Sequence, residues 1–558
     1  MKDKGNVNLL EGVRGMFLLS LLLLFFFFYE IGNRHFADPD EGRYVEIPRE
    51  MTVTGDYVTP RLNGLKYFEK PPLFYWMQAA SIETFGVGET SMRIWTMLFA
   101  IIGCLSVFFV GSRCYSANTG FLATGILATS ILYYVHSRLI ILDLVLSVLM
   151  NGALWCFYLI FVSKKAVGLS RKPLIIAMYA LAALAGLTKG LVAIVLPAFI
   201  VFLWMALTSN WKKIREILYL PGLLVFFAIF LPWHILVAIR NDDFLYYYFI
   251  VEHFLRYTTA IHCRYQPFWF FIPVLLAGFL PWTGFFLASL KDSLQKIKKD
   301  SENAFLVCWI LGVLLFFSFS NSKLIPYVLP AAQPMALLTG IALEKSINAK
   351  GKDFRYGVWL NILTLVVACG AYLLAKREIA DVMEDANANL LINVFFGLLL
   401  IAAITLLCAL HFKNFRFSSM LIYLFLSANM MWVINKAAVF YQETKKPSTK
   451  RFAEIINLNR KKDDLVFCYG RYYQDFPVYL HDTVGVVDFI GELEFGARSE
   501  KDTKRLITKE DFWNLWSTTN RRIFLLLSSS DYGEAFAKVN VFHRILDFNK
   551  YFLVITNQ

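Results

Sequence analysis

The sequence predicts an α-helical polytopic membrane protein with about thirteen transmembrane helices, external interfacial helices and a small C-terminal α/β domain. Hydrophobic residues make up 57% of the 558 residues and charged residues only 17%, whereas soluble proteins are about 45–50% apolar. The Lys and Arg residues, which give a net charge of +13, stand in short clusters between apolar runs. Because this pattern follows the positive-inside rule and forms no basic face on a folded domain, no nucleic-acid partner is expected.

The apolar runs predict the spanning helices, because each approaches the length needed to cross about 30 Å of hydrocarbon. They lie near residues 16–33, 93–111, 120–138, 140–162, 174–188, 190–207, 217–239, 268–290, 305–320, 324–343, 357–375, 390–411 and 418–440. No good small-residue cleavage site follows the first run. We therefore expect a retained first helix rather than a signal peptide.

The charges between these runs predict the topology. Basic clusters such as Lys164–Lys165, Lys212–Lys213 and Lys298–Lys299 recur in alternate connections. Lys and Arg mark cytoplasmic loops, so the N-terminus is expected in the cytoplasm and, with an odd number of spans, the C-terminus outside. Three large segments are then external: 34–92, 240–267 and 441–558. These boundaries divide the chain into a membrane domain, 1–440, and an external domain, 441–558.

Two of the external segments have predictable structure. The apolar stretch 72–85 is too short to span a bilayer and predicts a helix lying in the membrane interface. In the last segment, the runs 465–469, 484–489 and 523–527 are typical of strands, and 509–519 is typical of a helix. The last segment is therefore expected to form an α/β domain.

The first external loop begins with a candidate site. Asp38 before Pro39, with Glu41 three residues later, predicts a helix with Asp38 as its N-cap. Asp40 is not needed for that cap and shares a helix face with Tyr44. A carboxylate beside a Tyr and an Arg at a membrane surface can orient a polar substrate. An ordinary favourable charge at a helix N-terminus is the alternative interpretation of Asp40.

Further ionisable residues recur on the external side. They are Lys70, Asp143, Lys189, Arg256 and Lys323, with Tyr327 after the last of them. An unpaired charge at a membrane helix is costly, so such residues are functional candidates. Taken singly, Lys70 could be a lysine reaching the lipid headgroups, and Asp143 could pair with Arg138. Together, they indicate an outward-facing, cation-rich cavity suited to a phosphate-bearing lipid.

The same motifs carry a family resemblance. Residues 39–51, 62–64 and 67–71 resemble the first external loop of the lipid A aminoarabinose transferases, polyprenyl-phosphate-dependent enzymes of the GT-C clan related to protein O-mannosyltransferases. The likeness extends through the Asp143 hinge and residues 187–190, 252–256, 322–330 and 491–496, and so covers nearly the whole chain. Gly42 departs from the small residue with a side chain that is expected at its position.

This resemblance implies transfer of a sugar, 4-amino-4-deoxy-L-arabinose or another amino sugar, from undecaprenyl phosphate to a lipid A phosphate. The reaction would take place at the periplasmic face of the bacterial inner membrane. The implied catalytic residues are Asp40 and Asp143, and the implied substrate-binding residues are Glu41, Arg43, Tyr44, Tyr67, Lys70, Lys189, Arg256, Lys323 and Tyr327. No cofactor is required for the chemistry. Some relatives bind zinc, for which Glu69 and His253 are candidates, with incidental surface residues as the alternative.

Two other functions are compatible with the sequence. A protein O-glycosyltransferase would use the same type of donor. A lipid transporter is the rival outside enzymes, but transporters commonly show internal repeats and polar groups near the membrane midplane. Here the charges gather at one face of the predicted bundle and no repeat is evident.

Overall fold

The computed structural model describes residues 13–166, 168–258, 265–348, 353–375, 386–445, 448–500, 505–537 and 541–558. The chain folds as two compact units. The first consists of Met1–Ile31, Trp95–Pro232 and Phe249–Phe440, and the second of Gly32–Ile94, Trp233–Tyr248 and Tyr441–Gln558. The second unit thus combines the first predicted external loop with the C-terminal segment. The predicted division at residue 440 stays a prediction.

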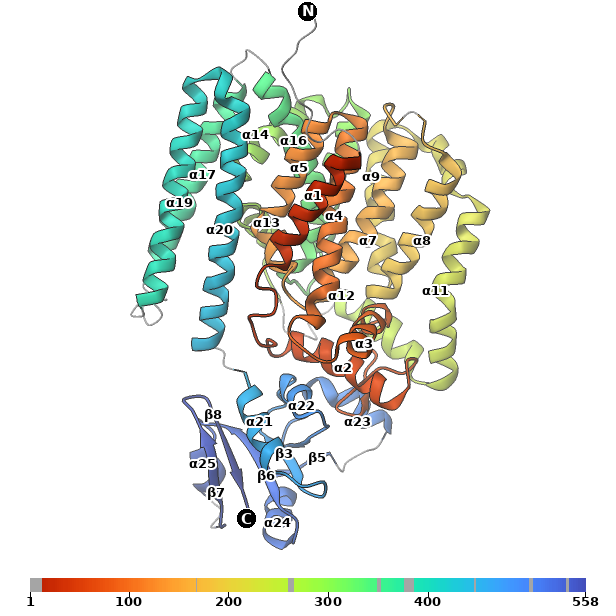
Figure 1. Cartoon of the computed structure of the whole chain (residues 1–558). Coiled ribbons are helices and arrows are strands. Elements are labelled where there is room, and N and C mark those ends of the chain that lie inside the picture. The colour runs from red at the N-terminus through yellow and green to blue at the C-terminus, as the bar shows by residue number, and fades with distance from the viewer. Residues whose placement is uncertain are drawn as a thin grey trace, which may run out of the picture. The chain divides into compact units, whose positions relative to one another are not determined.

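The first unit is built from helices (Figure 1). In chain order, the helices that lie wholly or mainly in it are α1 (Val13–Phe28), α4 (Ile94–Cys114), α5 (Ala117–Ala128), α6 (Ile131–His136), α7 (Leu142–Phe157), α8 (Arg171–Lys189), α9 (Val192–Thr208), α10 (Ile214–Ile217), α11 (Leu220–Arg240), α12 (Arg256–Thr258), α13 (Phe271–Gly278), α14 (Thr283–Lys296), α15 (Ser301–Ser318), α16 (Ala332–Asn348), α17 (Asp353–Ala375), α19 (Ala386–His411) and α20 (Arg416–Lys445). Every predicted apolar run falls on one or more of these helices.

The lengths of these helices agree with a multi-pass membrane protein. Within the described residues, nine helices are long and apolar enough to cross a bilayer. A tenth span results if the bent pair α13 and α14, which meet at 118°, counts as one. Three further apolar helices, Gly15–Phe28, Ala117–Ala128 and Val192–Thr208, are shorter. The helical membrane fold is confirmed, and the number of thirteen spans stays a prediction.

Small residues allow close helix packing in this unit, as is common in membranes. A Cβ atom added to Gly340 of α16 would lie 2.9 Å from the Cβ of Ala123 in α5. Helices α7 and α8 also pack against each other. Because α7 starts soon after the 137–141 turn and α8 ends at Lys189, this packing brings the start of one helix to the end of the other.

The second unit contains a helical part formed by the first external loop. Helix α2 (Asp40–Thr54) packs against α3 (Leu73–Phe85), and β1 (Arg61–Leu62) pairs with β2 (Leu65–Lys66) in an antiparallel hairpin between them. Asn63 and Gly64 form the hairpin turn with φ of 55° and 78°, the left-handed values that Asn and Gly tolerate best. The helix predicted over 72–85 is therefore confirmed as a helix.

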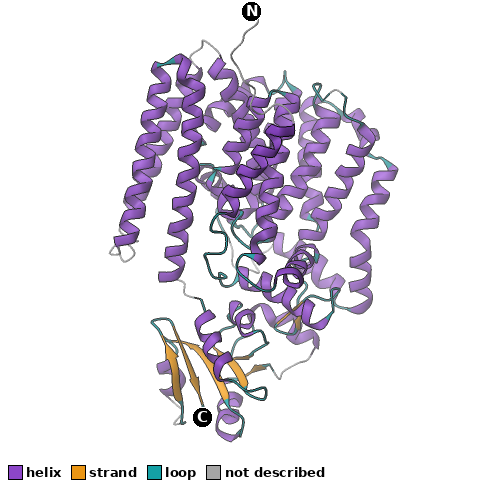
Figure 2. Ribbon diagram, in the orientation of Figure 1, coloured by secondary structure: helices purple, strands orange, loops and turns teal. Residues whose placement is uncertain are grey.

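The C-terminal part of the second unit is an α/β fold with a six-stranded sheet, whose strands are orange in Figure 2. The strand order is β5-β4-β3-β6-β8-β7, parallel from β5 to β6 and antiparallel beyond. The strands are β3 (Leu465–Tyr469), β4 (Gly485–Val487), β5 (Leu506–Ile507), β6 (Ile523–Ser528), β7 (Arg544–Phe548) and β8 (Phe552–Thr556). The helices are α21 (Lys450–Asn459), α22 (Asp475–Leu480), α23 (Glu494–Glu500), α24 (Lys509–Thr518) and α25 (Tyr532–Ala537).

The core of this sheet explains which strands were predictable. Phe467 of β3 and Leu525 of β6 are buried and pack with Phe512 and Trp516 of α24. Continuous apolar runs are typical of such buried parallel strands. In contrast, β7 is at the sheet edge and half-exposed, and β5 has only two residues, so neither shows a clear apolar run.

Candidate functional site

The start of α2 differs from the prediction at Asp38. The helix begins at Asp40, and Pro39 occupies the cap position without a side-chain cap. Asp38 instead accepts a hydrogen bond from the backbone N–H of Gln474 at 2.8 Å and one from Arg471 at 3.0 Å. The predicted N-cap role of Asp38 is therefore wrong, because its carboxylate binds donors beside α22 rather than the amides of its own helix.

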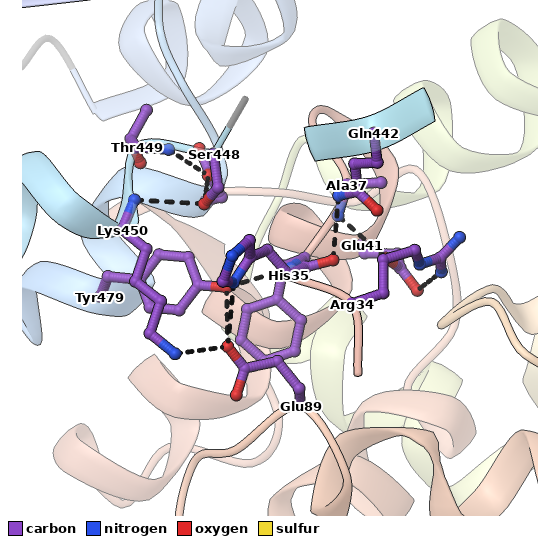
Figure 3. Close-up of polar contacts among 12 residues, drawn as sticks. Arg34, His35, Ala37, Glu41, Glu89, Gln442, Ser448, Thr449, Lys450 and Tyr479 are labelled. Carbon is purple, nitrogen blue, oxygen red and sulfur yellow. Dashed lines mark hydrogen bonds and ion pairs between the residues drawn. The ribbon is translucent and has the colours of Figure 1, made fainter. Parts of the chain in front are cut away.

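Glu41 holds the segment before α2 in place together with two arginines. Its carboxylate accepts from the backbone N–H of Ala37 at 2.8 Å and pairs with Arg34 at 2.9 Å (Figure 3). It also pairs with Arg93 at 2.8 Å. Glu41 and Arg93 are almost fully buried. Because both carboxylate oxygens have these partners, Glu41 anchors the helix start. The predicted contact between Glu41 and substrate stays a prediction.

Arg43 is largely buried at the centre of a polar cluster, which we call the Arg43 cluster: Asp40, Arg43, Tyr67, Glu69 and Glu492. Arg43 Nε is 2.6 Å from a carboxylate oxygen of Glu492, and Arg43 Nη1 is 3.3 Å from Asp40. Burial lowers the pKa of Arg43, but neighbouring Tyr67, Glu492 and Glu69 outweigh that effect and hold it well above its usual value. The guanidinium is therefore a permanent positive charge.

Gly42 makes this cluster possible by its lack of a side chain. A Cβ atom on Gly42 would lie 2.5 Å from the backbone carbon of Gln474 and 2.5 Å from the backbone nitrogen of Asp475. Such a contact is too close, so only glycine lets α2 approach the start of α22 in this way. The side chain of Gln474 in turn donates to Glu492. The unexplained Gly42 of the sequence therefore serves to position Glu492 against Arg43.

Asp40 is the open side of the Arg43 cluster. The side chain of Asp40 is 62% exposed, whereas Arg43 and Glu492 are each 13% exposed. Lys70 donates to the backbone carbonyl of Glu69 at 2.7 Å and lies 3.8 Å from its carboxylate. Thus a solvent-accessible carboxylate sits on a buried, oriented cation, an arrangement that can bind and place a polar substrate group.

The two predicted tyrosines of this region are buried. Tyr67 is 3% exposed, and burial, together with Glu69 and Glu492 and against the effect of Arg43, raises its pKa well above the usual value. Tyr44 packs its ring against Phe74 and Tyr75, with centroids 5.6 and 6.1 Å apart. The phenol of Tyr67 is therefore neutral, and the rings of Tyr44 and Tyr67 form part of the wall around Arg43.

A second cluster, in the first unit, brings three predicted residues together. Asp143 in the first turn of α7 forms an ion pair with Lys189 in the last turn of α8. The Lys189 ammonium also lies 4.6 Å from the ring centroid of Tyr327. Both charges are favourable at these helix ends, because the helix dipole stabilises an anion at the N-terminus and a cation at the C-terminus.

The alternative pairing of Asp143 with Arg138 is not what the structure shows. Arg138 donates to the backbone carbonyls of Phe27 at 3.2 Å and Tyr29 at 2.5 Å. These carbonyls lie at the end of α1, where helix carbonyls lack partners within the helix. Arg138 therefore caps the C-terminal end of α1, and Asp143 pairs with Lys189.

The other two predicted cations of the first unit have local contacts. Arg256 pairs with Glu252 one helical turn earlier at 2.7 Å. Lys323 is buried, donates to the carbonyl of Ser320 at 2.5 Å and lies 5.7 Å from the ring of Tyr265. Their predicted contact with a substrate phosphate stays a prediction.

The predicted metal site involves Glu69 and His253. Among the described residues, no three His, Cys, Asp or Glu side chains gather closely enough to hold a metal ion. The side chain of His253 lies outside the described part of the chain. The contact of Glu69 with Lys70 gives it a cationic neighbour. A zinc ion at these residues stays a prediction.

Sequence reasoning missed Glu492 as a site residue. The segment 491–496 carries the family likeness, but no local pattern identifies which acidic residue meets Arg43 from more than 400 positions away. Gly496 marks close packing in the structure, because a Cβ there would lie 2.6 Å from the carbonyl oxygen of Lys66. In the sequence, the two glycines around Glu492 hint at close packing of this segment but do not name its partner.

Comparison with known proteins adds independent findings. The family described as dolichyl-phosphate-mannose-protein mannosyltransferase matches residues 16–248, and the aminoarabinose transferase C-terminal domain matches residues 452–557. The undecaprenyl phosphate-α-4-amino-4-deoxy-L-arabinose arabinosyl transferase of Aeromonas hydrophila is 30% identical over 390 residues, covering 68% of this chain and 70% of the relative. The enzyme of the same name from Aeromonas salmonicida is 28% identical and covers 93% of both chains.

A solved structure is similar over almost the whole chain. The crystal structure of ArnT from Cupriavidus metallidurans bound to undecaprenyl phosphate has a TM-score of 0.83 and 26% sequence identity. The match covers 98% of this chain and 99% of that protein. Both the helical unit and the α/β fold therefore have counterparts in that structure.

Proposed function

Because the chain belongs to the family of undecaprenyl phosphate-α-4-amino-4-deoxy-L-arabinose arabinosyl transferases, we propose that it transfers 4-amino-4-deoxy-L-arabinose from undecaprenyl phosphate to a phosphate of lipid A. The chain is a multi-pass membrane glycosyltransferase. The proposal adds the donor, the acceptor and the location, the periplasmic face of the bacterial inner membrane. The observation that carries it is the near-complete match to a structure bound to undecaprenyl phosphate.

The charges of the two clusters support this chemistry. When the sugar leaves undecaprenyl phosphate, negative charge develops on the departing phosphate, and fixed cations stabilise that charge. Lys189, oriented by Asp143 and the Tyr327 ring, and Lys70, held by Glu69, are suitable cations. An acceptor phosphate oxygen is already anionic and needs little deprotonation. Asp40 therefore serves to place the substrate, for example through the ammonium group of the sugar.

A protein O-glycosyltransferase is the second candidate, favoured by the mannosyltransferase match over 16–248. Its acceptor would be a Ser or Thr hydroxyl, and Asp40 would then have to act as a general base. The two candidates thus assign different roles to the same carboxylate. The acceptor that is modified distinguishes them, because the first candidate modifies a phosphate of lipid A and the second a Ser or Thr hydroxyl.

The test is a transfer assay with purified full-length protein in detergent. The donor is undecaprenyl phosphate-linked aminoarabinose, and the acceptors are lipid A and, separately, a Ser/Thr-rich peptide, with no nucleotide sugar added. We expect aminoarabinose-modified lipid A by mass spectrometry. Modification of the peptide alone would establish the second candidate, and lack of transfer without a nucleotide sugar would refute both.

The proposed orientation has its own test, based on the alternation of positive charges. A periplasmic reporter fused after Gln558 should be active, and the same reporter inserted in the 297–300 turn should be inactive. A cytoplasmic reporter at the two positions should give the opposite pattern. If the reporter after Gln558 is active only in the cytoplasm, the proposed periplasmic transfer is excluded.

A further inference from the structure

A second candidate site is a cavity of about 530 Å³ within the second unit. This volume lies within the range of about 300–1,000 Å³ typical of small-ligand pockets. Its polar lining residues are Glu89, Lys450, Glu454, Asn457, Tyr479 and His481. No residue of the Arg43 cluster is among the residues that line it. The cavity is therefore a separate feature of this unit.

One wall of the cavity is an ordered carboxylate. Glu89 pairs with Lys450 at 2.8 Å, accepts from the Tyr479 hydroxyl at 3.2 Å and lies 3.7 Å from His35 Nδ1 (Figure 3). Burial raises the pKa of Glu89, but the hydrogen bonds from His35 and Lys450 outweigh that effect and hold it below its usual value. Glu89 is thus ionised and largely neutralises the charge of Lys450.

One face of α21 forms an adjoining part of the lining. Lys450, Glu454 and Asn457 follow one another at intervals of four and three residues, so they lie on the same side of the helix. Glu454 is exposed. The Asn457 amide group donates to the backbone carbonyl of Tyr479 at 3.1 Å, which orients its oxygen as an acceptor. These side chains offer hydrogen-bond acceptors at fixed spacing.

An aromatic pair and a histidine complete the cavity. Phe36 and Tyr479 stack with ring centroids 5.3 Å apart at 23°. His481 ends α22 in a left-handed conformation with φ of 59°. Burial and, after it, the neighbouring Arg49 lower the pKa of His481. Its imidazole is therefore neutral at neutral pH and can both donate and accept a hydrogen bond.

The charges exclude one class of ligand. Among the lining side chains, Glu89 and Glu454 carry two negative charges and Lys450 one positive charge, so the lining has a net charge of −1 with His481 neutral. A phosphate or carboxylate ligand is disfavoured here, whereas hydroxyl groups and an ammonium group would find acceptors. Apolar surface for the face of a ring is provided by Leu458 and the aromatic pair.

We propose that this cavity binds a sugar ring that is uncharged or carries an amine. The inference rests on the proposed function only for the source of the sugar, which is either the aminoarabinose of the donor or a sugar unit of the glycolipid acceptor. In both cases the ring hydroxyls bind Glu454 and Asn457, and the ring face lies on the apolar surface. The site is a binding site and takes no part in bond formation.

The test measures binding without transfer. Full-length protein in detergent is titrated by saturation-transfer-difference NMR with the methyl glycoside of 4-amino-4-deoxy-L-arabinose and with methyl N-acetylglucosaminide. We expect Asn457→Ala and Glu454→Gln each to raise the Kd of the bound glycoside about fivefold, the loss of one hydrogen bond. Tighter binding of the first glycoside assigns the cavity to the donor sugar, and tighter binding of the second assigns it to the acceptor.

A control makes the result specific. Glu510→Gln removes the same charge from an exposed position at the start of α24 and should leave the Kd unchanged. The inference is overturned if neither glycoside binds, if the α21 variants bind as well as the wild type, or if inorganic phosphate displaces the glycoside. Failure of transfer with intact glycoside binding would refute the proposed function alone.

Discussion

The Asp40→Asn substitution tests whether the Arg43 cluster acts on substrate. The change keeps the size of the side chain and removes only its charge. Asp40 contacts Arg43 at 3.3 Å and is 62% exposed, while Arg43 keeps Glu492 at 2.6 Å in the variant. The orientation of Arg43 should therefore survive, and any effect on transfer comes from the lost carboxylate.

The contacts of Asp40 determine how much stability the Asp40→Asn variant should lose. An exposed ion pair contributes about 0–1 kcal/mol, and an acidic residue in the first turn of a helix about 0.3–1 kcal/mol before screening by salt. We expect a total loss of stability of about 1 kcal/mol. A group that places substrate in the transition state contributes more: a rate loss on the order of 100-fold corresponds to about 2.7 kcal/mol.

The assay compares transfer rate and thermal unfolding for three proteins at matched expression. The control is Asp482→Asn, because Asp482 is 58% exposed and pairs with Arg460 at 3.3 Å, which matches Asp40 in geometry. We expect both variants to unfold within a few degrees of the wild type and only Asp40→Asn to lose transfer. Equal, small losses of rate in both variants would refute a substrate role for Asp40 and make Asp143 the leading catalytic candidate.

Three further predictions follow from the same contacts. Lys70→Ala should raise the KM for the donor about tenfold with little change in kcat, because Lys70 is proposed to bind the donor phosphate in the ground state as well; an unchanged KM would contradict this. Asp143→Asn and Lys189→Ala should each lower the unfolding temperature, because each single change leaves a half-buried charge without its partner. The double variant should lose about 1 kcal/mol less free energy of unfolding than the sum of the two single losses. Additive losses would mean that the two residues do not interact. Burial and, after it, Glu46 raise the pKa of Glu50 from 4.5 to about 8, so folding favours its protonated form, and the stability it contributes is complete below about pH 4.5 and lost as the pH rises through 8. Glu50→Gln should therefore unfold at a higher temperature than the wild type at pH 9 and at nearly the same temperature at pH 5, and a pH-independent difference would contradict the assignment.

The membrane helices could be predicted because their signal is local. An apolar run of about twenty residues must hide its backbone polar groups in a helix wherever it lies in the bilayer. From the sequence, Asp143 and Lys189 could be placed on the same side of the membrane, at hinges of adjacent helix pairs, but their ion pair could not be predicted. The packing of α7 against α8 decides the partner of Asp143. It pairs Asp143 with Lys189 rather than with Arg138, which is nearer in the sequence.

The start of α2 beside the Arg43 cluster could be predicted from local sequence only in part. The motif around Asp38 correctly indicated a helix start, but it assigned the cap to the wrong residue. Local cap rules assume that a side chain has only its own helix to bind, whereas Asp38 finds the backbone of Gln474 and the side chain of Arg471. These donors come from a segment more than 400 residues further along the chain.

The helical membrane fold, strands β3, β4 and β6 and the residues that carry the family likeness could be recognised from local sequence patterns. The roles of those residues depend on the packing of distant segments: Glu41 anchors Arg34 and Arg93, Gly42 allows a close backbone approach, and Glu492 pairs with Arg43. The physical reason is the range of the interactions. Burial of apolar surface and backbone hydrogen bonding act on short windows of sequence, whereas an ion pair depends on which distant segments fold to within about 4 Å of each other.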